Sequence, residues 1–297
     1  MQTNTPSRSR IRLTRRGRLA VVVAGAVVAG AAVAVPLLTL ATDHEQAQSA
    51  MLVIPEGWRS GQVYDAIDKA LALPPGSTRK SLDKAALHLP GEAGGNPEGY
   101  LLPATYPVRK GATPESLLRA MVDNAKRKYD AAPVAAGAQR EAMNVYQTVT
   151  IASIVQAEAG TKVDMGKVAR VVYNRLQSGM PLQMDSTINY ALNRNTVRTS
   201  QDDAQLASPY NSYQRTGLPP TPIDNPGEQA MRAALNPTPG DWLYYVTVRP
   251  GDTRFTADYN EHLKNVADFN AAHQDAATQP SDSGAPALPA SPGGAGS

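Results

Sequence analysis

Apolar residues recur along the chain with periods that predict helices and strands in mixed order. An apolar run at 51–54 predicts a short strand, and apolar residues at helical spacing between 63 and 71 predict a helix that Ser60 caps. A Gly-rich loop follows and ends in the apolar and aromatic stretch ATYPV, which predicts a second strand. The first strand and helix together predict a small α/β module over 51–90.

Longer periodic segments predict the helices of the rest of the chain. They cover 114–129 with Thr113 as N-cap, 139–159 ended by Gly160, 165–177 ended by Gly179, and 225–235 with Asn225 as N-cap. The stretch DWLYYVTVRPGDTRF alternates and predicts a strand with a turn at Pro250-Gly251. Residues 271–297 are mostly Ala, Pro, Gly, Ser and Asp, which predicts a disordered tail. The fold class expected from this order is α+β.

The segment 19–41 contains no charged residue and is long enough to span a bilayer as a single transmembrane helix. Six arginines lie in the segment 1–18, and Asp43 and Glu45 follow the apolar run, so the positive-inside rule places 1–18 in the cytoplasm and the body outside. A cleaved secretory signal with small residues near 39–41 is the alternative, although its apolar region is usually shorter. Both interpretations export the body of the protein.

The amino-acid composition argues against several classes of function. The net charge is +3, and the six N-terminal arginines leave a balance of −3 for the remainder, which argues against nucleic acid as a partner. Cysteine is absent, so disulfides and thiolate chemistry are excluded. The four histidines lack metal-ligand spacing, and no HExxH or G-x-S-x-G motif occurs, so we expect no metal and no serine nucleophile.

One carboxylate stands out against a helical apolar pattern. Within IASIVQAEAG, Glu158 shares a predicted helix face with Ile151, Ile154 and Val155. A carboxyl packed against such a face is partly desolvated and can hold and donate a proton, as a general acid must. The alternatives are a last-turn carboxylate in solvent, or one neutralised by Arg170 or Arg175. Structural ion pairs also use such positions.

Polar and aromatic residues are dense in two loop-rich segments, VVYNRLQSGMPLQMDSTINYAL and SPYNSYQRTGLPPTPIDNPGEQAMRAALNP. Amides and hydroxyls interleaved with aromatic faces suit a sugar chain, which offers hydroxyl groups and apolar ring faces. Ordinary turn chemistry explains any one of these residues but explains their density less well. Asp185, beside Thr187, can also be read as a helix cap.

These segments resemble the endolytic murein transglycosylase (YceG-like) family. The resemblance covers roughly Val53 to Asn270 and includes VIPEG, EGYLLPATY, ASIVQAEA and the two loop-rich segments in the family's order. This chain departs from it at several positions: family members often have Glu at Gln156, Asp at Ala104, Pro at Ser186 and Gly at Thr221. Gln156 leaves Glu158 as the only carboxylate of its motif.

The resemblance implies a bacterial cell-membrane protein with a LysM-like module over 51–90 and a catalytic domain over 97–270 outside the cell. It implies cleavage within nascent peptidoglycan glycan strands, with Glu158 as the catalytic residue and no cofactor. Peptidoglycan and the plasma membrane are the implied partners, and peptidoglycan synthases and division proteins are further candidates. Candidate residues for positioning the strand are Glu98, Asn174, Gln183, Asp185, Tyr190 and Tyr213.

A single acid suffices for the expected reaction because the C6 hydroxyl of N-acetylmuramic acid acts as the nucleophile. Glu158 would protonate the glycosidic oxygen and then accept the C6 hydroxyl proton as a 1,6-anhydro ring closes. Most glycosidases use a pair of carboxylates instead. A hydrolytic muramidase would therefore need Asp185 as its second carboxylate, and a non-catalytic wall-binding or division scaffold would need neither.

Overall fold

The computed structural model describes residues 50–194, 200 and 202–278. The chain divides into two units, Met1–Met51 and Leu52–Ser297, and the elements below belong to the second apart from the first two residues of β1. The predicted cytoplasmic segment 1–18 and membrane span 19–41 lie outside the described residues. Within the described ranges, no helix is both long and apolar enough to cross a bilayer.

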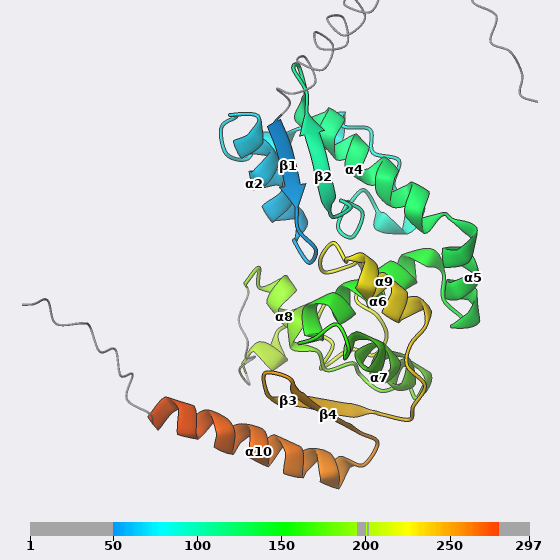
Figure 1. Cartoon of the computed structure of the whole chain (residues 1–297), viewed down its shortest axis with the longest axis vertical. Helices are drawn as coiled ribbons and strands as arrows, with labels where there is room; N and C mark the ends of the chain where they lie inside the picture. The colour runs from blue at the N-terminus through cyan, green and yellow to red at the C-terminus, as the bar shows by residue number, and fades with distance from the viewer. Residues whose placement is uncertain (1–49, 195–199, 201, 279–297) are drawn as a thin grey trace, which may run out of the picture. The chain divides into compact units, whose positions relative to one another are not determined.

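The N-terminal part pairs strand β1 (Ala50–Ile54) with strand β2 (Ala104–Val108), and Figure 1 shows them as neighbouring arrows pointing in opposite directions. Helices α2 (Ser60–Ala70) and α3 (Ser77–Lys80) and short 3₁₀ turns lie between them in sequence. Both predicted strands are confirmed. Ser60 is not the N-cap of α2, because Arg59 takes that position and its N–H is satisfied by Gln62 Oε1 at 3.0 Å.

Helix α4 (Pro114–Tyr129) is confirmed with its cap, since Thr113 Oγ1 accepts the N–H of Ser116. The single helix predicted over 139–159 is wrong. The chain forms α5 (Ala132–Arg140) and α6 (Val145–Glu158), with Ala142 in the left-handed region at φ 56°. The break occurs because Asn144 and Gln147 cap each other's backbone N–H groups at the start of α6.

Of the two helix ends predicted at glycines, one is confirmed and the other is wrong. Helix α7 (Met165–Gln177) is confirmed, and Gly179 follows it at φ 65°. Helix α6 ends at Glu158 because Ala159 is extended at ψ 117°, and Gly160 has no positive φ, so the expected glycine termination is wrong. The abrupt end leaves Glu158 as the last helical residue.

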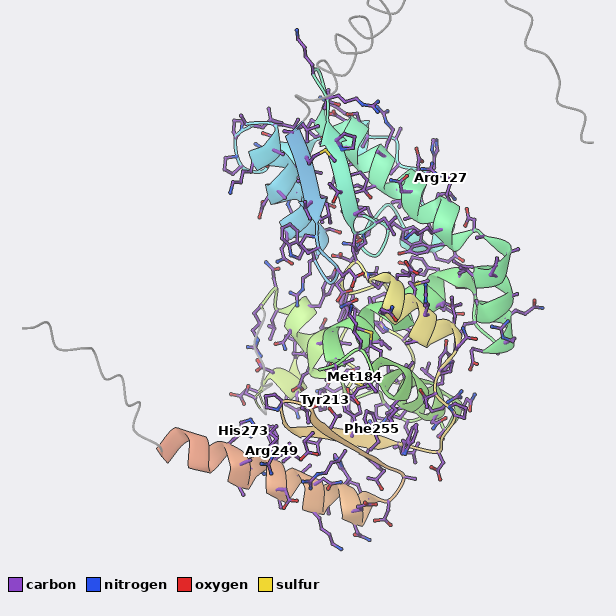
Figure 2. The ribbon with its side chains drawn as sticks, viewed as in Figure 1. Arg127, Met184, Tyr213, Arg249, Phe255 and His273 are labelled. Carbon is purple, nitrogen blue, oxygen red and sulfur yellow. The ribbon has the colours of Figure 1, made fainter. Side chains whose placement is uncertain are left out.

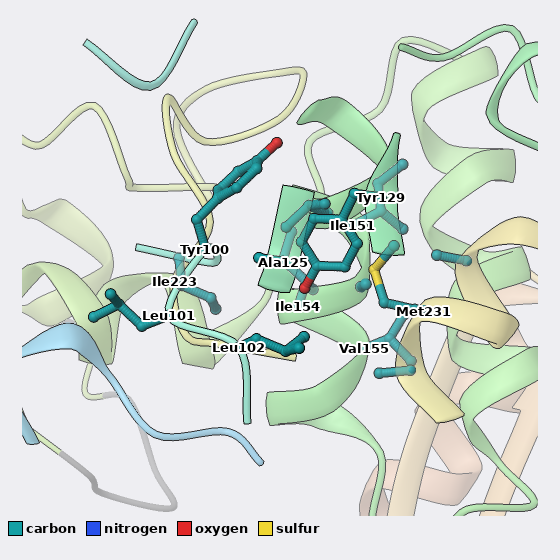
Figure 3. Packing of buried hydrophobic residues seen from close by; sticks show 14 of the residues in the cluster. Tyr100, Leu101, Leu102, Ala125, Tyr129, Ile151, Ile154, Val155, Ile223 and Met231 are labelled. Carbon is teal, nitrogen blue, oxygen red and sulfur yellow. The ribbon is translucent and has the colours of Figure 1, made fainter. Parts of the chain in front are cut away.

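Helix α6 lies at the centre of the core. Ile151, Ile154 and Val155 are fully buried, and Figure 3 shows them packed with Tyr129 and Met231. The apolar side chains around α6 come from α4, α7, α9 and the loop after Gly99. Residues 148–155 of α6 are all buried, so the helix reaches open space only near its two ends, and Glu158 lies at the C-terminal one.

Helix α9 (Glu228–Leu235) packs against α6 and starts later than predicted. Gly227, not Asn225, occupies its N-cap position. Asn225 is fully buried instead, where its side chain accepts the Leu101 N–H and donates to the Trp58 carbonyl and to Glu98. A tertiary hydrogen-bond network therefore uses the amide that the local pattern assigned to a cap.

The C-terminal part is a hairpin covered by a helix. Strands β3 (Tyr244–Arg249) and β4 (Asp252–Thr256) pair antiparallel around the predicted turn at Pro250-Gly251. Helix α10 (Tyr259–Thr278) packs against β3 (Figure 1) and continues past the predicted start of the tail at 271. With α8 (Asp185–Ala191), these elements form a mixed α+β fold, as predicted.

Candidate active site

Glu158 is held by two donors from distant parts of the chain. Its Oε1 accepts the backbone N–H of Ser186 at 3.0 Å, and its Oε2 accepts the hydroxyl of Tyr245 at 2.7 Å. Ser186 lies in the first turn of α8 and Tyr245 in β3. The first contact uses a backbone N–H, which a proline at position 186 would lack.

The arginines weighed as partners of Glu158 are used elsewhere. Arg170 lies 3.9 Å from Glu141 and also donates to the Thr238 carbonyl. Arg175 contacts the carbonyls of Leu243, Pro181 and Leu182. Across the described parts of the chain, no salt bridge of Glu158 is found. The half-buried Glu158 is therefore bound by neutral donors and not by a cation.

Tyr245 is placed by the hairpin and the loop before α8. Its ring stacks on Phe255 at a centroid distance of 5.6 Å, and its hydroxyl lies 3.1 Å from Met184 Sδ. Burial, and then the neighbouring Glu158 carboxylate, raise the pKa of the Tyr245 hydroxyl well above its ordinary value. The hydroxyl stays protonated at neutral pH and can donate to Glu158.

Two hollows meet at Glu158. The larger has a volume of about 700 Å³ and the smaller about 310 Å³, and both are lined by Glu158, Asp185 and Tyr245. Helices α2, α6, α8 and α10 and the hairpin all contribute side chains to them. The carboxyl group therefore borders open space on more than one side.

Asp185 and Tyr213 form a second polar pair in the smaller hollow. Asp185 is the first residue of α8, and its Oδ1 accepts the hydroxyl of Tyr213 at 2.5 Å. Met184 occupies the N-cap position, so Asp185 is not the cap. Figure 2 shows Met184 and Tyr213 beside the hairpin that carries Phe255. The pair orients Asp185 toward the space that Glu158 also faces.

Gln183 joins the same hollow through Arg175. The backbone of Gln183 is left-handed at φ 54°, and its N–H donates to the Ser212 carbonyl. Its Oε1 accepts from Arg175 at 2.9 Å, and the Arg175 guanidinium also lies 5.2 Å from the ring centroid of Tyr244. Arg175 thus fixes the loop before α8 and strand β3 relative to α7.

Glu98 and Tyr190 line a separate hollow of about 840 Å³. Glu98 Oε1 accepts from the Ser60 N–H and from Asn225, and its Oε2 accepts the Tyr190 hydroxyl at 3.1 Å. Burial raises the pKa of Glu98 to about 7, against the lowering effect of the Ser60 and Tyr190 hydrogen bonds and of the Arg59 charge. Arg59 lines this Glu98 hollow and also the hollow of about 700 Å³ at Glu158, called the Glu158 hollow below. The two hollows are therefore neighbours that share Arg59.

Asn174 does not face Glu158. Its side-chain amide donates to the carbonyls of Gly240 and Trp242, which positions the loop that leads into β3. The structure therefore brings Glu158, Asp185, Gln183 and Tyr213 together, puts Glu98 and Tyr190 at a neighbouring hollow, and gives Asn174 a structural contact. Among the described residues, no group of His, Asp and Glu is arranged to hold a metal ion.

Comparison with known proteins matches this arrangement to one family. The model of the YceG-like family matches residues 29–268, well over half of the chain. The chain belongs to the YceG-like family. A crystal structure of a YceG-like protein from Listeria monocytogenes has 32% sequence identity and a TM-score of 0.66, over 73% of this chain and 75% of that one.

Named relatives of this YceG-like chain are endolytic murein transglycosylases. The Bacillus subtilis protein is 38% identical over 168 residues, which is 56% of this chain and 46% of the relative. The Streptococcus pneumoniae serotype 2 protein is 35% identical over 177 residues, which is 58% of this chain and 32% of the relative. The match thus spans less than half the length of either relative.

Sequence reasoning missed two groups of the YceG-like site. The sequence pattern assigns Tyr245 only to a strand, although a tyrosine in a half-buried strand indicates a hydroxyl that needs a hydrogen-bond partner. The Ser186 N–H carries no sequence signal, because a backbone donor becomes available only when α8 begins at Asp185.

Proposed function

We propose that this protein is an endolytic lytic transglycosylase that cleaves the bond between N-acetylmuramic acid and N-acetylglucosamine within nascent peptidoglycan glycan strands. The observation that carries the proposal is Glu158, a single carboxyl at the open end of a buried helix, held by Ser186 and Tyr245 where two hollows meet. Membership of the YceG-like family and the names of the relatives support the same reaction class.

The proposed reaction uses one residue for both proton transfers. Glu158 gives its proton to the glycosidic oxygen as the bond from that oxygen to C1 of the muramic residue breaks. The ionised carboxylate then takes the proton of the C6 hydroxyl as the C6 oxygen bonds to C1 and closes the 1,6-anhydro ring. The proton count balances, and no water enters the product.

The two donors to Glu158 serve the second half of this cycle. The Tyr245 hydroxyl and the Ser186 N–H stabilise the carboxylate left after the first proton transfer. They also fix the plane of the carboxyl group, so that an oxygen faces the hollow in both steps. Asp185, Gln183 and Tyr213 supply acceptors and donors for the sugar groups beside it.

Further proposals concern the whole chain. Residues 19–41 would anchor it as a single-pass cell-membrane protein, with the N-terminus in the cytoplasm and the body outside. The order β1, α2, α3, β2 supports a LysM-like glycan-binding module, although its second strand lies beyond the expected limit at residue 90. Glycan strands would be the substrate, and synthases and division proteins the candidate protein partners, in wall assembly and control of glycan length.

The test is digestion of purified, uncrosslinked glycan strands with the full chain in mild detergent, followed by mass analysis of the new ends. The wild type should produce 1,6-anhydro ends, about 18 Da lighter than hydrolytic ends because no water is added. Glu158→Gln should lose them, since an amide cannot donate the proton. Glu92→Gln makes the same change at an exposed residue of the 3₁₀ turn Gly91–Ala93 and should retain them.

Other outcomes are equally informative. Reducing ends would replace the proposal with hydrolysis and would make Asp185 the second carboxylate. Intact strands with every variant would favour a binding or scaffold role. Anhydro ends that persist in Glu158→Gln would show that another group is the acid.

A further inference from the structure

A tryptophan from the N-terminal part of the protein lines the Glu158 hollow. Trp58 lies in the turn between β1 and α2, within the proposed LysM-like module, and borders the same cavity of about 700 Å³ as Glu158 and Tyr245. The residue is half-buried, because one part of it packs against the hydrophobic core and another part stays accessible. The module therefore contributes an aromatic side chain to the wall of the catalytic hollow.

The indole N–H of Trp58 is a donor without an acceptor among the described residues. No hydrogen bond from this group is found there, and it is not one of the enclosed polar atoms that lack a partner, so the protein does not cover it. Tryptophan combines a broad apolar ring with a single N–H donor, and both usually find a partner. An accessible indole in the wall of a hollow can therefore offer a ligand an apolar surface and a hydrogen bond.

The backbone at Trp58 is fixed beside the end of α6. The Gly57 N–H donates to the Asn225 carbonyl at 2.8 Å, and the Trp58 carbonyl accepts the backbone N–H of Asn225 at 3.0 Å and its side-chain amide at 2.8 Å. Gly57, at φ 77°, lies against the last turn of α6, since a Cβ on it would be 3.4 Å from Cγ of Gln156, two residues before Glu158. A ring on so constrained a backbone loses little freedom when a ligand binds.

We propose that Trp58 binds the glycan strand directly in the Glu158 hollow, with its indole ring against the apolar face of a sugar ring and its N–H donating to an oxygen of the strand. This inference rests on the proposed function, which puts a glycan strand in that hollow. The acceptor is a sugar hydroxyl or an acetamido carbonyl, the neutral acceptors that such a strand offers. The N-terminal module thus takes part in holding the sugars at the catalytic residue.

Tryptophan fluorescence tests this contact, because the chain has only two tryptophans and Trp242→Phe leaves Trp58 as the single one. In a full-length Glu158→Gln background, which should not cleave, uncrosslinked glycan strands should shift the Trp58 emission to shorter wavelength, since a sugar displaces water from the indole. The converse protein, Trp58→Phe with Trp242 intact, should show no shift. Trp242 packs with Phe255 and is not part of the lining of the Glu158 hollow.

Binding affinities in the same Glu158→Gln background separate the ring from its N–H. Trp58→Phe keeps an aromatic ring and loses the donor, so affinity for glycan strands should fall roughly threefold, whereas Trp58→Ala loses both and should fall about tenfold or more. Val53→Ala shortens a 59% exposed side chain of the same module and should leave affinity unchanged. Thermal unfolding of each variant shows whether a lost core contact accounts for the change, and Trp58→Phe should unfold within a few degrees of its parent.

These measurements fail separately from the proposed function because none of them requires cleavage. A Trp58 emission shift with strands that the wild type hydrolyses or leaves intact would support the contact and reject the transglycosylase reaction. Anhydro ends from the wild type, together with an unchanged Trp58 emission when strands saturate the protein, would overturn the contact alone. Undiminished affinity in Trp58→Ala, or strands that do not bind at all, would also overturn it.

Discussion

Glu158 has the contacts that a carboxyl group needs if it is to release a proton and take one back. Its two oxygens accept from Ser186 and Tyr245, and these donors carry no charge. A cation in their place would favour the ionised carboxylate, which has no proton to donate to a substrate. At the scale of single residues, the site therefore depends on the neutrality of its donors as much as on the carboxyl group itself.

Tyr245→Phe tests the stronger of these two contacts. The variant removes the hydroxyl that donates to Glu158 Oε2 and keeps the ring on Phe255. A hydrogen bond to a charged group contributes about 1.5–3 kcal/mol, so kcat should fall roughly ten- to hundredfold while KM changes little. The measurement is steady-state release of anhydro ends from glycan strands.

Tyr259→Phe is the matched control for this prediction, since Tyr259 is 56% exposed on α10. It should retain wild-type kinetics and thermal stability. A Tyr245→Phe protein with undiminished kcat would mean that the Ser186 N–H alone stabilises the carboxylate.

At the scale of elements, the boundary between α5 and α6 decides where Glu158 lies. The apolar repeat continues across 139–159, but the reciprocal bonds of Asn144 and Gln147 begin a new helix at Val145. The cap therefore sets where α6 starts and which of its residues face the core. Its last residue then falls at the hollow, where α8 begins and β3 passes.

Asn144→Ala should destabilise the protein by about 1 kcal/mol, because it leaves the Gln147 N–H in the first turn of α6 without its side-chain acceptor. The free energy of unfolding, measured in urea, is the appropriate quantity. Activity at low temperature should be unchanged, since the cap lies at the opposite end of α6 from Glu158.

Gln139→Ala serves as the comparison for Asn144→Ala because it lies on the exposed side of α5 and caps no helix. It should change the free energy of unfolding by a few tenths of a kcal/mol at most. Equal effects from the two variants would show that α6 does not depend on its cap.

At the scale of the whole molecule, a buried polar network connects segments that are far apart in sequence. Asn225 bonds to Trp58, Leu101 and Glu98, and Glu98 bonds to the start of α2 and to Tyr190 of α8. Such a network fixes relative positions because each lost bond leaves a buried group without a partner. It thereby positions Arg59, which borders the Glu98 and Glu158 hollows.

This network should make stability depend on pH. The folded pKa of Glu98 is raised to about 7 from an ordinary value of 4.5, so the folded state holds a proton that the unfolded state has released. The contribution is fully present below pH 4.5 and is lost as pH rises through 7. At about 1.4 kcal/mol per pKa unit, the loss is on the order of 3 kcal/mol.

Glu98→Gln should flatten this dependence, because glutamine keeps a carbonyl acceptor for Ser60 and Asn225 but does not titrate. The measurement is the midpoint of thermal unfolding between pH 5 and 8 for the variant and the wild type. A wild-type midpoint that stays level or rises across this range, with the same slope in Glu98→Gln, would exclude Glu98 as the titrating group.

Local patterns determined much of the element inventory. Thr113 and Ser116 form a cap within four residues, α7 ends before a glycine with positive φ, and the hairpin turns at Pro250-Gly251. Each of these features depends on neighbours in the chain, so the sequence contains all of its parts. The sequence likewise singled out Glu158, because a lone acid in an apolar helix face is visible without a structure.

Only the tertiary structure decided what surrounds that acid. The residues that bind it are 28 and 87 positions away in the sequence, and the amide of Asn225 left its expected cap for partners up to 167 positions away. Such pairings depend on which buried groups meet when the core closes, and no local period or spacing encodes that choice.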